Sequence, residues 1–109
     1  MACSRSRTVL CTPPGGDALG AYHSMEVPYV FDTRPAWLPT GPEDLALVDA
    51  IGSYWTQFAA TGDPNGPNLS EWPVYDPAVD SFLELGASVR TGEGVRTETC
   101  DLLASSATP

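Results

Sequence analysis

Apolar residues recur at steps of three and four along one long segment of the chain. Between residues 43 and 61 these positions are Leu45, Val48, Ile51, Trp55 and Phe58. Such spacing places apolar side chains on one face of a helix. Pro42 suits a first helical turn, and Gly62 followed by an Asp-Pro pair suits the end of a helix. The pattern therefore predicts one long amphipathic helix over about 43–61.

A shorter helical pattern lies earlier in the chain. Val27, Val30 and Phe31 fall at i, i+3 and i+4, which places them on one helical face. Ser24 is a suitable N-cap for this turn. Pro28 argues against a central strand because proline has no amide hydrogen to donate to a strand ladder. The sequence predicts a short helix directly after a loop that carries the histidine.

Extended segments are predicted at both ends of the chain. The apolar run 8–11 favours a short edge strand, and segments 72–75 and 82–85 are predicted to form a hairpin around an Asp-Pro pair. Glycines between 86 and 94 predict irregular structure there. Residues 95–100 are then predicted to form a last short strand.

Composition and charge narrow the possible functions. The 109 residues allow one domain with a modest core, and the 10 glycines and 11 prolines require many turns. The net charge of −9 comes from 14 acidic residues against five arginines, so binding to nucleic acids and to anionic membrane surfaces is not expected. No apolar stretch is long enough for a transmembrane segment, and the N-terminus lacks the apolar core of a signal peptide. A soluble chain is expected, in a compartment that the sequence leaves open.

The cysteines and the histidine give little sign of a metal site. Cys3, Cys11 and Cys100 have no metal-like spacing, and His23 is the only histidine. One disulfide with a leftover thiol is possible, but three reduced cysteines are the simpler interpretation. No metal or organic cofactor is expected.

Residues that could carry catalysis are few. A lone loop histidine such as His23 is more often a surface or core residue than a catalytic one. The Gly-x-Ser-x-Gly pattern of a nucleophile elbow does not occur in the sequence. Ser24 is adjacent to His23 and better explained as a helix cap. Cys100 stays open as a nucleophile, although nothing around it indicates a lowered pKa. Glu26 either braces the histidine loop or faces water.

The segment around the histidine nevertheless resembles a known family. The run from Gly20 to Phe31 is similar to the catalytic-histidine segment of type-B carboxylesterases, which include cholinesterases and bacterial nitrobenzyl esterases. The shared pattern is Gly-Ala-x-His-x-x-Glu, an aliphatic residue, Pro-Tyr and Val-Phe. Three further matches follow in the family's order, at residues 54–65, at 71–75 with 82–85, and at 96–102. We therefore expect a family region over 13–103, a poorly matching segment over 1–12 and a mobile tail over 104–109.

The resemblance implies a fold and a role for the histidine. The expected fold is α/β, the C-terminal portion of an α/β-hydrolase with a histidine loop, one long amphipathic helix and a short hairpin. His23 would be the general base of a serine–acid–histidine triad, and Glu26 would support its loop. In this fold the serine and the acid precede the histidine along the chain. Both, with most of the central sheet, would then lie upstream of Met1, as in a truncated or frame-disrupted gene.

Two functions follow from this resemblance. The first is a carboxylic-ester hydrolase fragment that supplies His23 and acts on esters only when an upstream portion completes it. The second is a non-catalytic remnant, or an interaction module that binds a partner through its apolar helix face. Inactivity of the chain by itself is expected, because a histidine without a nucleophile has little to activate. Self-association through residues 45–58 is also expected, because the apolar stripe lacks the sheet it would cover.

Overall fold

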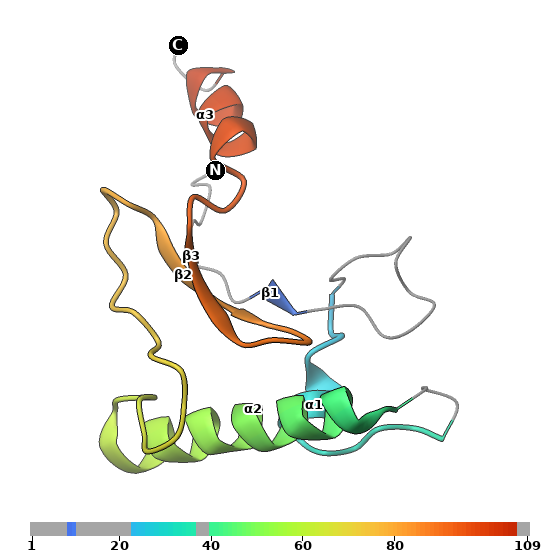
Figure 1. Cartoon of the computed structure of the whole chain (residues 1–109). Helices are drawn as coiled ribbons and strands as arrows, with labels where there is room; N and C mark the ends of the chain where they lie inside the picture. The colour runs from blue at the N-terminus through green and yellow to red at the C-terminus, as the bar shows by residue number, and fades with distance from the viewer. Residues whose placement is uncertain (1–8, 11–22, 37–39, 107–109) are drawn as a thin grey trace.

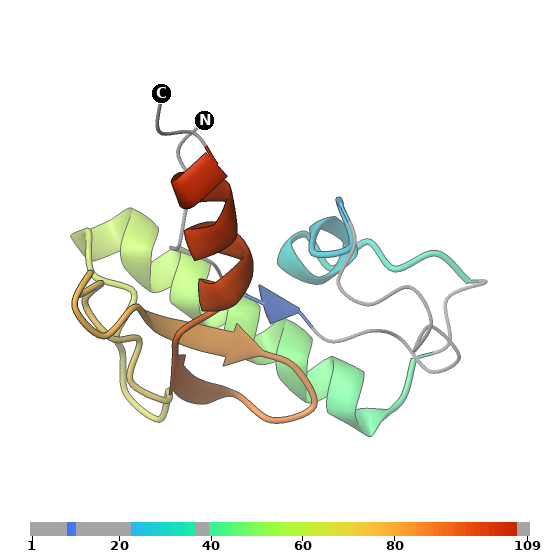
Figure 2. The same ribbon diagram turned by 90° about the horizontal axis from the view of Figure 1, so that it is seen from above.

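The computed structural model describes residues 9–10, 23–36 and 40–106. The elements follow in the order β1 (Val9–Leu10), α1 (Val27–Val30), α2 (Pro42–Thr61), β2 (Ser81–Leu85), β3 (Arg90–Glu93) and α3 (Thr97–Ser106). α2 runs below the small sheet, α1 lies against the first half of α2, and α3 projects from the sheet on the side away from α2 (Figures 1 and 2). The expected α/β class is confirmed.

The long helix forms where the apolar spacing places it. α2 begins at Pro42, one residue before the predicted start, and ends at Thr61. The Asp44 carboxylate accepts a hydrogen bond from the Gly41 amide at 2.8 Å, which satisfies one free donor at the helix start. Gly62 adopts a left-handed conformation with φ of 81° and closes the helix by donating to the Phe58 carbonyl at 2.8 Å.

The buried face of α2 differs from the predicted stripe. Val48 and Ile51 are buried as expected, but the other stripe residues, Leu45, Trp55 and Phe58, are exposed. Two residues outside the stripe, Leu47 and Tyr54, are buried in their place. The core therefore covers only the first two-thirds of the helix, and the apolar face continues beyond it without cover.

The short helix after the histidine loop is confirmed, but its cap and its buried face are not as predicted. Ser24 has a left-handed backbone with φ of 67°, and the N-cap position belongs to Glu26, whose side chain makes no capping bond. Tyr29 is the buried residue of α1, whereas Val27 and Phe31 are exposed. The side of α1 that carries Tyr29 faces the core, because there the Tyr29 hydroxyl reaches a polar partner on α2, the Asp44 carboxylate.

The hairpin joins different segments from those predicted. β2 pairs antiparallel with β3, and β1, inside the predicted segment 8–11, pairs parallel with β2 on its other side. Glycine does not prevent β3 from forming, because Gly92 lies opposite Phe82 and leaves room for the aromatic ring. Segment 72–75 is not a strand. The Asn65 side chain takes the place of a ladder partner there, accepting from the Trp72 amide at 2.7 Å and donating to the Trp72 carbonyl at 3.1 Å.

The C-terminal segment is helical rather than extended. α3 begins at Thr97, so the predicted strand over 95–100 is wrong, and the helix continues through Ser106. Cys100 is buried in this helix and is disulfide-bonded, which overturns the expectation of three reduced cysteines. Its partner is Cys3 or Cys11, both outside the described residues.

One hydrophobic core connects the helices α1 and α2 with the strand β2. It brings together side chains of the histidine turn, α1, α2 and β2, namely Met25, Tyr29, Leu47, Val48, Ile51, Tyr54, Leu83 and Leu85. Tyr54 packs edge-on against Trp72 with ring centroids 5.3 Å apart, and its hydroxyl donates to the Ser70 carbonyl at 2.6 Å. Burial raises the pKa of Tyr54 above 10.0, and the hydrogen bonding to Ser70 offsets part of that rise. Within the described ranges, no helix is both long and apolar enough to cross a membrane.

Candidate functional site

The histidine lies on the surface, in a turn that leads into α1. His23 is exposed at the start of the turn over residues 23–26. The turn is closed by the Val27 amide, which donates to the Ser24 carbonyl at 3.3 Å. In the part of the chain that the structure describes, the His23 imidazole has no hydrogen-bond partner.

Two buried side chains fix the turn below the histidine. Met25 and Tyr29 are both only 3% exposed and belong to the core. The Tyr29 hydroxyl donates to the Asp44 carboxylate at 2.9 Å, and Asp44 is itself held by the start of α2. The position of His23 is therefore set by a connection between α1 and α2 that residue spacing alone does not reveal.

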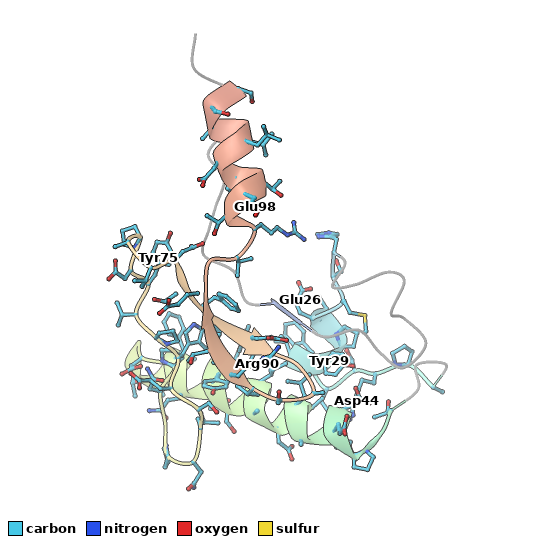
Figure 3. All side chains as sticks on the ribbon, turned by 45° about the horizontal axis from the view of Figure 1, so that its top comes forward. Glu26, Tyr29, Asp44, Tyr75, Arg90 and Glu98 are labelled. Atoms are coloured by element: carbon cyan, nitrogen blue, oxygen red, sulfur yellow. The ribbon has the colours of Figure 1, made fainter. Side chains whose placement is uncertain are left out.

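Glu26, the predicted support residue, contributes through its backbone. Its carbonyl accepts from the amides of Tyr29 at 3.0 Å and Val30 at 2.9 Å, which starts α1. Its carboxylate is exposed and makes no hydrogen bond to any described residue. In Figure 3 Tyr29 points toward Asp44 on α2, whereas Glu26 lies on the side of α1 away from α2.

The described residues bring no complete catalytic apparatus to His23. Ser24 is its sequence neighbour in a left-handed backbone conformation, with φ of 67°. Cys100 cannot act as a nucleophile in this state because its sulfur is part of a disulfide, so that alternative is set aside. Nor do the described His, Cys, Asp and Glu residues gather into any group that could hold a metal ion.

An apolar hollow lies at the far end of α2 from the histidine. We call it the aromatic hollow; it has a volume of about 420 Å³ and is lined by Tyr54, Trp55, Phe58, Pro64 and Trp72. The rings of Trp55 and Trp72 lie 6.0 Å apart at an angle of 53°. The approach of Trp72 to α2 depends on the loop that the Asn65 side chain holds, which residue spacing alone does not reveal.

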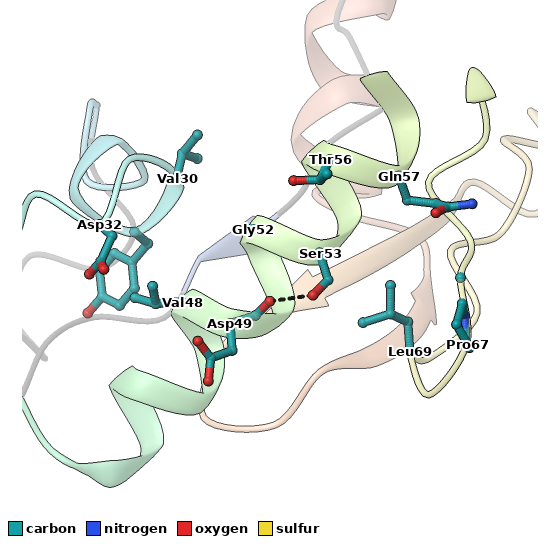
Figure 4. A pocket seen from close by; sticks show the side chains of 12 residues that line it. Val30, Asp32, Val48, Asp49, Gly52, Ser53, Thr56, Gln57, Pro67 and Leu69 are labelled. Atoms are coloured by element: carbon teal, nitrogen blue, oxygen red, sulfur yellow. Dashed lines mark hydrogen bonds between the residues drawn. The ribbon is translucent and has the colours of Figure 1, made fainter. Parts of the chain in front are cut away.

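A second, more polar depression runs along α2 near α1. It measures about 530 Å³ and includes Asp32, Asp49, Gly52 and Ser53 in its lining. Figure 4 shows the Ser53 hydroxyl directed back to its own helix, where it donates to the Asp49 carbonyl at 2.8 Å. Asp32 is paired with Arg34 at 2.6 Å. The side chains of Asp32 and Ser53, two of the polar groups that line this depression, thus already have partners within the protein.

Comparison with known proteins identifies the family of the chain. The family model of the carboxylesterase family matches residues 2–103, so the chain belongs to that family. The chain is 36% identical over 90 residues to acetylcholinesterase of Gallus gallus, covering 75% of this chain and 11% of that protein. It is 38% identical over 72 residues to bile salt-activated lipase of Homo sapiens, covering 62% of this chain and 9% of that protein. The chain thus spans about a tenth of the length of these relatives.

Solved structures agree with the sequence comparison. A thermophilic PNB esterase superposes with a TM-score of 0.68 at 28% identity, over 77% of this chain and 18% of its own. A carboxylesterase of Geobacillus stearothermophilus superposes with a TM-score of 0.64 at 29% identity, over 87% of this chain and 21% of its own. The chain is thus a type-B carboxylesterase family member whose fold corresponds to part of an α/β-hydrolase.

Proposed function

We propose that His23 serves as the general base of a serine–acid–histidine triad that hydrolyses carboxylic esters. The observation that carries this proposal is an exposed imidazole on a turn held firmly by two buried side chains, inside a family-matched segment. General-base catalysis needs a histidine whose ring is held in a fixed position with one nitrogen within reach of the reacting groups. Glu26 supports the turn by starting α1 and takes no part in proton transfer.

In the proposed reaction His23 acts twice. It first takes the proton of a serine hydroxyl as that oxygen attacks the ester carbonyl, and it returns the proton to the leaving alcohol. It then takes a proton from water as the water oxygen attacks the acyl-enzyme carbonyl, and it returns this proton to the serine oxygen as the bond between that oxygen and the acyl group breaks and the acid is released. The serine and the triad acid come from polypeptide beyond these 109 residues, so the chain by itself is proposed to be inactive. No metal or organic cofactor is needed for this reaction.

The test compares the chain alone with a chimera. In the chimera, residues 13–103 replace the matching region of the PNB esterase, and hydrolysis of a short-chain nitrophenyl ester is measured for both proteins. We expect the chain alone to match the buffer blank. We expect His23→Ala to lower kcat of the chimera at least about 1,000-fold, because the serine loses its base. A chimera that is folded and active but indifferent to His23→Ala would refute the proposed role.

The alternative function is a non-catalytic module that binds a partner through its helix face. The exposure of Trp55 and Phe58 favours it, because large aromatic side chains are seldom left in water without a partner. Turnover by the chain alone that disappears with His23→Ala would contradict both functions. It would mean that a nucleophile lies within these 109 residues.

A further inference from the structure

The Asn65 side chain connects two distant points of the loop between α2 and β2. Its Nδ2 donates to the Asp63 carboxylate at 3.0 Å and to the Trp72 carbonyl at 3.1 Å. Its Oδ1 accepts from the Trp72 amide at 2.7 Å. The Asn65 backbone amide donates at 2.9 Å to the same carboxylate oxygen of Asp63. One side chain thus joins the exit of α2 to the segment that carries Trp72.

The two hydrogen bonds to Trp72 require an amide at position 65. The backbone of Trp72 offers one donor and one acceptor, and an asparagine side chain meets both because one of its ends accepts and the other donates. An ionised carboxylate can only accept. In place of Asn65 it would leave the Trp72 carbonyl without its donor. It would also bring a second negative charge against the Asp63 carboxylate, which now accepts from Nδ2 at 3.0 Å.

The residue that follows makes this amide chemically vulnerable. Asn65 precedes Gly66, whose backbone nitrogen can approach the side-chain carbonyl carbon with no Cβ in the way. The other asparagine of the chain, Asn68, precedes Leu69, whose bulk hinders the same approach. Asn65 and Gly66 are both half-buried in a surface loop, so water reaches them.

We propose that Asn65 is a site of spontaneous deamidation whose conversion releases Trp72 from α2. The Gly66 nitrogen gives up its proton to hydroxide and forms a bond to Cγ of Asn65. The bond from Cγ to Nδ2 then breaks, and the leaving nitrogen takes up protons from water and departs as ammonia. Water opens the resulting succinimide ring at either carbonyl carbon, and the ring nitrogen regains a proton. The net reaction consumes one water, releases one ammonia and leaves aspartate or isoaspartate at position 65.

The folded loop controls how often this reaction begins. The hydrogen bonds to Asp63 and Trp72 hold Cγ of Asn65 in place, so the loop must open locally before the Gly66 nitrogen can attack. Surface loops open far more often than the whole chain unfolds. After conversion the side chain no longer has the nitrogen that donates to the Trp72 carbonyl. The loop therefore cannot close again in its original form, and the change is irreversible because the ammonia is lost.

The consequence of deamidation falls on the aromatic hollow. Trp72 packs edge-on against Tyr54 with ring centroids 5.3 Å apart, and its ring lies 6.0 Å from that of Trp55. Release of the Trp72 backbone removes one wall of the hollow and leaves both indole rings more open to water. These are two of the three tryptophans of the chain, so tryptophan fluorescence reports the release.

The experiment incubates the purified 109-residue chain at mildly alkaline pH. Deamidation is followed by peptide mass mapping and ammonia release, and the loop by tryptophan fluorescence. Gly66→Ala hinders the chemistry and keeps the fold, because its Cβ would meet Gln57 and Leu69 at 3.5 Å, an ordinary van der Waals distance. Asn65→Asp mimics one product. Asn68→Asp is the matched control, because it adds the same charge to the same loop at an exposed residue.

We expect the parent to deamidate at least about tenfold faster at position 65 than at position 68, and Gly66→Ala to slow the reaction at position 65 by a similar factor. We expect the aged parent and Asn65→Asp to emit at longer wavelength, and Asn68→Asp to keep the spectrum of the fresh parent. Equal rates at the two positions, or no slowing by Gly66→Ala, would overturn the proposed site. A fully deamidated parent with an unchanged spectrum would overturn the release of Trp72, and this measurement decides the point even if Asn65→Asp does not fold.

Discussion

The Tyr29 hydroxyl donates a hydrogen bond to the Asp44 carboxylate at 2.9 Å and so ties the histidine turn to the start of α2. The two residues are 15 positions apart and belong to different helices. Asp44 also forms a second hydrogen bond, which its other carboxylate oxygen accepts from the Gly41 amide at the start of α2. The cap of the long helix and the placement of the histidine therefore depend on the same carboxylate.

Loss of the hydrogen bond between Tyr29 and Asp44 should lower the stability of the folded chain. We expect Tyr29→Phe to lower the free energy of unfolding by about 1–2 kcal/mol, because a partly buried carboxylate loses one of its donors. Urea denaturation followed by circular dichroism measures the change. Ser53→Ala removes an exposed hydroxyl bonded to its own helix and should change stability by less than about 0.5 kcal/mol. Equal stability of Tyr29→Phe and the parent would show that the bond contributes nothing.

Tyr54 should make stability depend on pH in the alkaline range. Its pKa is raised above 10.0 by burial, so the folded state holds the phenol proton more tightly than the unfolded state. The resulting stabilisation is fully present below pH 10.0, and it is lost as the pH rises through the folded-state pKa. Denaturation between pH 8 and 11 should show this loss in the parent and a weaker pH dependence in Tyr54→Phe. Identical slopes for the two proteins would contradict it.

Two glycines should respond in opposite directions to alanine. A Cβ at Gly92 would lie 2.4 Å from the Phe82 ring, so we expect Gly92→Ala to cost about 1–3 kcal/mol through forced repacking of the hairpin. A Cβ at Gly52, within α2, would meet nothing within 4 Å. Gly52→Ala should therefore stabilise the chain by about 0.5–1 kcal/mol through helix propensity. Thermal unfolding of both variants checks the signs, and a stabilising Gly92→Ala would be incompatible with the hairpin register.

The disulfide of Cys100 should contribute measurably to stability. It closes a long loop between the N-terminal region and α3, so we expect Cys100→Ser to lower stability by about 2–4 kcal/mol. Cys3→Ser and Cys11→Ser, measured in parallel, should reveal the partner, because only one of them will reproduce the loss. Reduction with dithiothreitol should lower the stability of the parent chain and leave that of Cys100→Ser unchanged. If all three serine variants match the parent, the disulfide has no stabilising role.

Much of the fold was predictable because its signals are local. The steps of three and four residues and the Pro42 and Gly62 boundaries predicted α2 to within one residue at its start. The hairpin was predicted at the wrong segments because the conformation of segment 72–75 depends on Asn65, seven residues before Trp72. The Asn65 side chain forms hydrogen bonds with the backbone amide and carbonyl of Trp72. The strand expected over 95–100 became a helix that is joined to the rest of the chain through a disulfide at Cys100.

The sequence by itself determined the family to which the chain belongs, the identity of the candidate catalytic histidine and the position of the long helix. Each of these depends on residue identity and spacing within a short stretch of chain. Only the tertiary structure decided which face of each helix is covered. Tyr29 rather than Val27 lies in the core, where its hydroxyl donates to a carboxylate on α2, and Phe58 is 57% exposed although it continues the helical face that carries the buried Tyr54. Burial depends on which neighbours are available in three dimensions, and periodicity alone does not specify those neighbours.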